Sequence, residues 1–178
     1  NKPDAWKNLS FDELKKAVHK YTYDVLYRLK IMDCAPDMVQ IGNEIRSGML
    51  FPDGAVPQYR QLAALVNEGI RAVRELLPET KVMIHLDQGG RHNCLMPWLD
   101  SMFNAGMLPI DAIGLSYYSF WHGTFMDLKD TMSRLIKLYN LPVYIVETAH
   151  PWRHCKGEHI SKELMETAGL EAGIAEQK

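Results

Sequence analysis

Short apolar segments of β character alternate with amphipathic helical segments along most of the chain. The β-like segments cover residues 38–44, 82–86, 112–118 and 143–146. The helical patterns start near residues 10, 62, 95 and 124, and a weaker one covers 159–168. Strands separated by helices pair in parallel through right-handed crossovers. The alternation therefore predicts an α/β fold, but it does not distinguish a doubly wound sheet from a barrel.

The first helical pattern carries its own start signal. Ser10 followed by Glu13 is a capping box, and Leu9 with Leu14 can form the accompanying hydrophobic staple. Apolar residues then recur at helical spacing. We expect them to form one apolar face, made of Phe11, Leu14, Val18, Tyr21, Val25 and Leu29.

Charge and composition exclude several classes of protein. The formal net charge is −2, so no basic surface for nucleic acid is expected, and no apolar run is long enough to insert into a membrane. The three cysteines, Cys34, Cys94 and Cys155, are too few and too widely spaced for a disulfide-rich secreted domain. Cys94 and Cys155 would be the pair if any disulfide formed, although the strands before them are not neighbours. We expect a soluble monomer.

Polar and aromatic residues follow all four predicted strands at their carboxyl ends. In parallel α/β folds this edge is where active sites are built. Glu44 and Glu147 each come directly after an apolar strand, so both should be partly desolvated. Glycosidic bond cleavage uses such a pair, one carboxyl protonated and one ionised. The alternative is that the two glutamates form surface salt bridges with Arg46 and Arg153, and their spacing leaves both interpretations open.

Aromatic side chains lie near the same edge of the predicted sheet. Their faces suit the apolar C–H faces of sugar rings. Core packing is the alternative, and it is expected for one of Tyr117 and Tyr118, because adjacent side chains of a strand point in opposite directions. The aromatic residues are Tyr117, Tyr118, Phe120, Trp121 and Trp152.

Four ordered motifs resemble those of glycoside hydrolase family 53, the arabinogalactan endo-β-1,4-galactanases. Residues 39–54 resemble the acid/base motif and residues 146–152 the nucleophile motif, and residues 84–87 and 114–123 are similar to the strands between. The opening segments 5–11 and 21–22 also fit. Phe51 stands where the family typically has Trp, and His150 where Tyr is common, so contacts beside both glutamates should differ.

The resemblance implies a partial (β/α)8 TIM barrel of about four βα units, strands four to seven, preceded by a helix. We expect residues 1–178 to be a single catalytic-domain fragment without strands one to three and eight. The resemblance makes Glu44 the acid/base and Glu147 the nucleophile of a retaining endo-β-1,4-galactanase that cleaves galactan and arabinogalactan side chains of pectin. It also implies a set of substrate-binding residues: Asn43, His85, Asp87, Tyr117, Trp121, His122 and Trp152.

Two other functions remain open. Another endo-glycanase of the same clan, a mannanase or cellulase, would share Asn43, Glu44 and a strand-seven glutamate, although not the residues after Glu147. A non-catalytic carbohydrate-binding barrel fragment would keep the carboxylates without using them. The expected partner is in every case a polysaccharide. Because cells do not readily import such polymers, we expect an extracellular or bacterial cell-envelope location.

No cofactor is expected, and no metal site is predicted. Some bacterial relatives hold a structural calcium in the loops after strand seven, but here only Glu158 and backbone carbonyls are available as oxygen ligands. A nearby group rich in metal-ligand residue types matches no zinc spacing. This group consists of His150, His154, Cys155 and His159.

Overall fold

The structure, a computed structural model, describes residues 1–149. Its helices are α1 (Phe11–Ile31), α2 (Tyr59–Leu76), α3 (His92–Asn104), α4 (Ser119–His122) and α5 (Phe125–Tyr139). Its strands are β1 (Met38–Ile41), β2 (Gly48–Met49), β3 (Gly54–Ala55), β4 (Lys81–Leu86), β5 (Ala112–Ser116) and β6 (Val143–Glu147). Two 3₁₀ helices complete the described part, η1 (Asp4–Trp6) and η2 (Ile45–Ser47).

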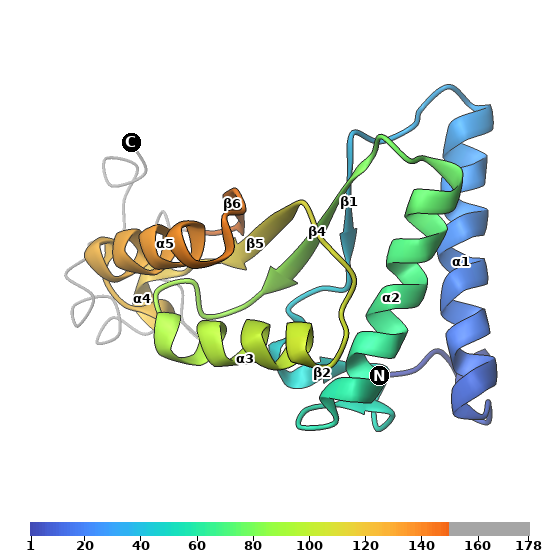
Figure 1. Cartoon of the computed structure of the whole chain (residues 1–178), viewed down its shortest axis with the longest axis horizontal. Coiled ribbons are helices and arrows are strands. Elements are labelled where there is room, and N and C mark those ends of the chain that lie inside the picture. The colour runs from blue at the N-terminus through green and yellow to red at the C-terminus, as the bar shows by residue number, and fades with distance from the viewer. Residues whose placement is uncertain (150–178) are drawn as a thin grey trace, which may run out of the picture.

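Four strands form one parallel sheet in the order β1-β4-β5-β6, which is their order along the chain. Strands β2 and β3 form a separate antiparallel pair. When each right-handed crossover moves to the next strand in the same direction, the connecting helices all lie on one face of the sheet. Figure 1 shows α2, α3 and α5 along one side of a curved sheet, with α1 beside α2. This arrangement is that of a barrel wall, because a doubly wound sheet would reverse direction and carry helices on both faces.

The main core fills the space between the sheet and these helices. Alternate strand residues point toward the helices, and Ile84, Leu86, Ile113 and Leu115 are fully buried there with α2 and α3 side chains. The intervening residues point to the opposite, inner face of the sheet. On that inner face Tyr144 and Val146 of β6 remain exposed.

The start of α1 confirms the sequence prediction. Ser10 Oγ accepts a hydrogen bond from the backbone N–H of Glu13, and Glu13 Oε2 accepts one from the backbone N–H of Ser10 at 2.8 Å. Leu9 packs against the small cluster that contains Leu14. The two ends of the staple therefore meet as expected.

The predicted apolar face of α1 is wrong in part. Leu14 and Val18 are buried, but Tyr21 is 63% exposed and Val25 41% exposed, whereas Leu26 is buried. Helix α1 makes its extensive contacts with α2. Only the stripe that faces α2 is therefore covered. Tyr21 and Val25 lie to one side of this stripe and line a groove along the open edge of β1.

Two strands, β1 and β5, are shorter than the sequence predicted. The segment 38–44 ends as a strand at Ile41, and 112–118 ends at Ser116. Within the described residues, no helix has the length and apolarity needed to cross a membrane. The weak helical pattern at 159–168 lies outside the residues that the structure describes.

Candidate active site at the carboxyl ends of the strands

Glu44 is placed by a turn directly after β1. Gly42 has a φ of +79° and Glu44 a φ of +48°, so the chain leaves the extended conformation and turns into η2. A Cβ on Gly42 would lie 2.5 Å from Cγ2 of the buried Ile45. Glycine is therefore required there for both its backbone angle and its lack of a side chain. This turn ends the strand before Glu44, which is the reason that the predicted strand was too long.

Substitution Gly42→Ala is expected to destabilise the fold more than Gly106→Ala, which is a matched control. Gly106 also has a positive φ, +90°, but a Cβ there would meet nothing within 4 Å. The control therefore carries the backbone penalty alone, about 1–2 kcal/mol. Crowding of Ile45 adds about 1–3 kcal/mol at Gly42. Chemical denaturation of both variants measures the difference in the free energy of unfolding, and equal losses would contradict this role for Gly42.

Glu147 is placed by an irregularity in the pairing of β5 with β6. Leu115 pairs with Ile145, but Ser116 pairs with Glu147, so Val146 is an extra residue in β6. Paired residues of parallel strands point to the same face. Ser116 lies on the inner face, and the extra residue therefore turns Glu147 toward that face as well. Regular pairing would have placed Val146 opposite Ser116 and turned Glu147 toward the helices.

The two glutamates meet at the rim of the sheet, together with His85 of β4. One carboxylate oxygen of Glu44, one of Glu147 and a ring nitrogen of His85 lie within 4.8 Å of one another. Both glutamates are half-buried, as their positions after apolar strands predicted. Three strand ends that are far apart in sequence thus supply one cluster of titratable groups.

Glu147 accepts a hydrogen bond from the hydroxyl of Tyr118, with 2.5 Å between the two oxygens. This hydrogen bond, with burial and the nearby carboxylates, raises the pKa of Tyr118 to about 12. The phenol therefore remains a hydrogen-bond donor at neutral pH. The hydrogen bond holds the Glu147 carboxylate in place at the rim.

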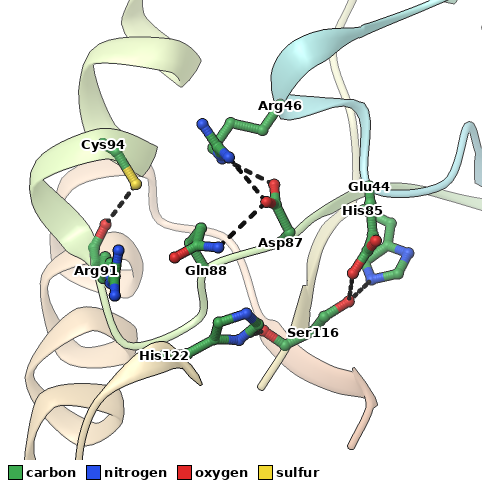
Figure 2. Close-up of polar contacts among 9 residues, drawn as sticks. All are labelled: Glu44, Arg46, His85, Asp87, Gln88, Arg91, Cys94, Ser116 and His122. Atoms are coloured by element: carbon green, nitrogen blue, oxygen red, sulfur yellow. Dashed lines mark hydrogen bonds and ion pairs between the residues drawn. The ribbon is translucent and has the colours of Figure 1, made fainter. Parts of the chain in front are cut away.

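Glu44 lies at one end of a chain of side-chain contacts, which Figure 2 shows around Ser116. Ser116 Oγ lies 2.6 Å from Glu44 Oε1 and 2.7 Å from Nε2 of His85. His85 Nδ1 lies 3.0 Å from Oδ1 of Asn43. His85 is only 1% exposed, and burial lowers its pKa against the opposing effect of the nearby carboxylates. The imidazole is therefore neutral over most of the neutral pH range.

Arg46 does not form the salt bridge that the alternative interpretation required. Its Nε and Nη2 donate to the two carboxylate oxygens of Asp87, each over 2.9 Å, in a bidentate pair (Figure 2). Glu44 instead contacts Ser116. Arg153, the proposed partner of Glu147, lies outside the described residues.

The other predicted substrate-binding residues differ in how far their side chains are exposed to solvent. Asn43 is exposed and Trp121 is 41% exposed, so both can be reached by a ligand at this rim. Tyr117 is buried, with its hydroxyl donating to the carbonyl of Gly123 at 2.8 Å. His122 is also buried, and its Nδ1 lies 3.0 Å from the carbonyl of Ser116. Trp152 lies outside the described residues.

A hollow beside Glu44 is lined by Asn43, Glu44 and Phe51, among others. Phe51 is half-exposed there, at the position where the sequence departs from the motif. Two side chains of the cluster were absent from the predicted site. Ser116 lies within the family-like segment 114–123, and the alternation of Tyr117 with Tyr118 did not determine which of the two aromatic side chains faces the site.

A metal ion would find few free ligands in the described cluster. Among residues 1–149, the group of metal-ligand residue types close enough together is Glu44, His85 and Glu147. Both ring nitrogens of His85 already contact Ser116 and Asn43. A cation would have to break one of these contacts. The residues considered for zinc and calcium lie outside the described part, as does Cys155, the expected partner of Cys94 in any disulfide. The zinc and calcium residues are His150, His154, Cys155, Glu158 and His159.

A family model described as "Glycosyl hydrolase family 53" matches residues 1–178. An uncharacterised protein of Niallia circulans is 46% identical over 159 residues, which are 85% of this chain and 43% of that protein. An arabinogalactan endo-β-1,4-galactanase of Cellvibrio japonicus is 35% identical over 160 residues, 84% of this chain and 42% of the relative. The chain therefore spans less than half the length of these relatives.

Solved structures agree with this match. The GH53 catalytic domain of Ignisphaera aggregans superposes with a TM-score of 0.92 at 36% identity, covering 99% of this chain and 50% of that one. A structure from a study of two fungal β-1,4-galactanases gives a TM-score of 0.81 at 30% identity, over 88% of this chain and 49% of that one. These neighbours are TIM-barrel enzymes, and the described sheet is a partial (β/α)8 barrel, as the family resemblance implied.

Proposed function

We propose that the protein to which this chain belongs is a retaining endo-β-1,4-galactanase with Glu44 and Glu147 as its catalytic carboxylates. The chain belongs to glycosyl hydrolase family 53, which is the starting point of the proposal. The proposed substrate is β-1,4-galactan, including the arabinogalactan side chains of pectin. Enzymes of this family work without a cofactor. The polymeric substrate favours action outside the cell or in a bacterial envelope, and residues 1–178 would belong to one catalytic domain.

The distance between the two glutamates is the observation that carries the proposal. One carboxylate oxygen of Glu44 lies within 4.8 Å of one carboxylate oxygen of Glu147. Inverting glycosidases separate their carboxyl groups by about 6.5–9.5 Å to leave room for a water molecule, and retaining ones by about 5–5.5 Å. The short separation supports direct attack of a carboxylate on the anomeric carbon.

The surroundings of the glutamates support different roles for them. Glu147 accepts the Tyr118 hydrogen bond, which holds its carboxylate in a fixed position and suits a nucleophile. Glu44 protonates the departing glycosidic oxygen while Glu147 attacks the anomeric carbon. Glu44 then takes a proton from the water that hydrolyses the glycosyl-enzyme and releases Glu147. Each step leaves the enzyme ready for the next.

Sugar binding is proposed for the remaining predicted residues. Asn43 is exposed beside Glu44 and would hydrogen-bond the 2-hydroxyl of the sugar being cleaved, and Trp121 would stack on a sugar ring. Asp87 is held by Arg46 and would accept from a sugar hydroxyl. Direct contacts from His85, Tyr117, His122 and Trp152 stay predictions.

Substitution Tyr118→Phe is expected to lower kcat on galactan by roughly 10- to 100-fold, the loss of one hydrogen bond to a charged group. Tyr139→Phe is the control, because the Tyr139 hydroxyl also donates to a carboxylate, Asp100, but on helices α5 and α3. The control should change stability and leave kcat unaltered. Steady-state kinetics of both variants checks this, and equal rates for Tyr118→Phe and the unaltered protein would remove Tyr118 from the nucleophile's support.

The proposed substrate is tested by product analysis with β-1,4-galactan, β-mannan and soluble cellulose. We expect galacto-oligosaccharides to be released in preference to products from the other two polymers. Preferred cleavage of mannan or cellulose would assign the site to another endo-glycanase of the same clan. Binding of galactan without cleavage would indicate a non-catalytic carbohydrate-binding protein.

A further inference from the structure

The contacts behind Glu44 fix where hydrogen atoms can lie. Asn43 Oδ1 also lies 3.4 Å from the side-chain amide nitrogen of Gln40, which donates toward it. The same Gln40 nitrogen donates to the carbonyl of Gly42 over 2.8 Å, so it is a donor, and the Asn43 atom that faces both Gln40 and His85 is assigned as an acceptor. His85 Nδ1, 3.0 Å away, must therefore carry a hydrogen to make a hydrogen bond with it.

This assignment determines the rest of the chain. A neutral imidazole with its hydrogen on Nδ1 has a lone pair on Nε2, which accepts the hydroxyl hydrogen of Ser116 over 2.7 Å. A hydroxyl group has one hydrogen only. The 2.6 Å contact between Ser116 Oγ and Glu44 Oε1 is then a hydrogen bond only if Glu44 is protonated and donates.

A second arrangement contains the same number of protons. The proton moves from Glu44 to Ser116 as the Ser116 hydrogen moves to His85, which leaves an ionised Glu44 and an imidazolium. Ser116 is fully buried and His85 nearly so. Burial disfavours the charged imidazolium, so the arrangement with the proton on Glu44 is the more stable one.

We infer that Ser116 and His85 are positioning residues that retain one proton in the chain Glu44–Ser116–His85 and thereby hold Glu44 as the acid before bond cleavage. The inference rests on the proposed function, in which Glu44 is the acid/base. When Glu44 passes its proton to the departing oxygen, Ser116 can donate to Glu44 or to His85 but not to both. One hydrogen bond is lost until the attacking water returns a proton to Glu44.

Charged and titratable groups from several elements face this chain. Glu44 lies after β1, Asp87 after β4 and Glu147 at the end of β6, and each favours a charged His85 when it is ionised. Arg46 neutralises Asp87, and Tyr118 donates to Glu147. His122 contacts the carbonyl of Ser116. Burial of His85 outweighs these carboxylates, so the imidazole stays neutral and available as an acceptor.

The first test is the tautomer of His85, which does not depend on activity. In protein labelled with ¹⁵N-histidine, the His85 ring resonances are identified by their loss in His85→Gln. We expect neutral His85 to carry its hydrogen on Nδ1. A hydrogen on Nε2 would overturn the inference, because Ser116 would then have to donate to an ionised Glu44 and the chain would hold no extra proton.

The second test is the pH dependence of kcat/KM in Ser116→Ala. Loss of the hydrogen bond between Glu44 and Ser116 should move the alkaline limb of the galactan profile to lower pH by about one unit. An aryl β-galactobioside with a dinitrophenolate leaving group needs no proton, so its kcat/KM should be unchanged. Ser116→Thr, which keeps the hydroxyl, should restore the limb.

Ser101→Ala is the control for Ser116→Ala, because its hydroxyl donates to the backbone carbonyl of Pro97 on the exposed face of α3. An alkaline limb that stays in place in Ser116→Ala would overturn the relay. If the unaltered protein does not cleave galactan, the proposed function fails, and the His85 tautomer still decides whether the proton chain exists.

Discussion

Substitution Glu147→Gln is expected to lower kcat/KM on β-1,4-galactan by on the order of 10⁴-fold or more, because the amide cannot form the glycosyl-enzyme. The change is nearly isosteric, and the amide can still accept from Tyr118. The loss should therefore lie in catalysis and not in folding. Initial rates of reducing-sugar release measure it, and hydrolysis at the normal rate would remove Glu147 as the nucleophile.

A control and a rescue separate the chemistry of Glu147 from damage to the protein. Glu75→Gln on α2 removes an exposed carboxylate that pairs with His19, and its rates should be unchanged. Glu147→Ala leaves space for a small anion at the anomeric carbon. Azide should restore cleavage of an activated galactoside and give the α-galactosyl azide, whereas the absence of rescue would argue against a displaced nucleophile.

Substitution Glu44→Gln is expected to have the second-largest effect, and it should depend on the substrate. General acid catalysis contributes typically 10²- to 10⁴-fold, so kcat/KM on galactan should fall by about that factor. The dinitrophenolate group of a dinitrophenyl galactobioside departs without a proton. The kcat/KM of Glu44→Gln on this substrate should therefore stay close to that of the unaltered protein. Equal losses on both substrates would contradict the assignment of Glu44 as the acid.

The local features of the fold could be predicted from the sequence because they depend on neighbouring residues. The capping box at Ser10 needs only Glu13, and the helix predicted to begin near Thr124 has Thr124 as its N-cap, with Asp127 completing a second capping box. The alternation of strands and helices likewise predicted parallel pairing. Whether the sheet was doubly wound or a barrel wall depended on strand order, which is set by contacts between distant segments.

In the candidate site, too, features set by neighbouring residues could be predicted, whereas features set by contacts between distant segments could not. The positions of Glu44 and Glu147 after apolar strands predicted that both would be half-buried at one rim, and the structure confirms this. The extra residue Val146, which turns Glu147 inward, could not be recognised without the register of β5 against β6. Arg46 was a plausible partner for the nearby Glu44, but Asp87 offers two oxygens in bidentate geometry. Which carboxylate pairs with Arg46 depends on how distant segments fold together, and the sequence does not show this directly.

The stereochemistry of hydrolysis tests the roles of Glu44 and Glu147 most directly. A β-1,4-galacto-oligosaccharide is cleaved in an NMR tube, and the anomeric proton of the newly formed reducing end is followed before mutarotation. Carboxylate oxygens within 4.8 Å of each other predict that the β-anomer appears first, through a covalent glycosyl-enzyme on Glu147. First appearance of the α-anomer would contradict this mechanism.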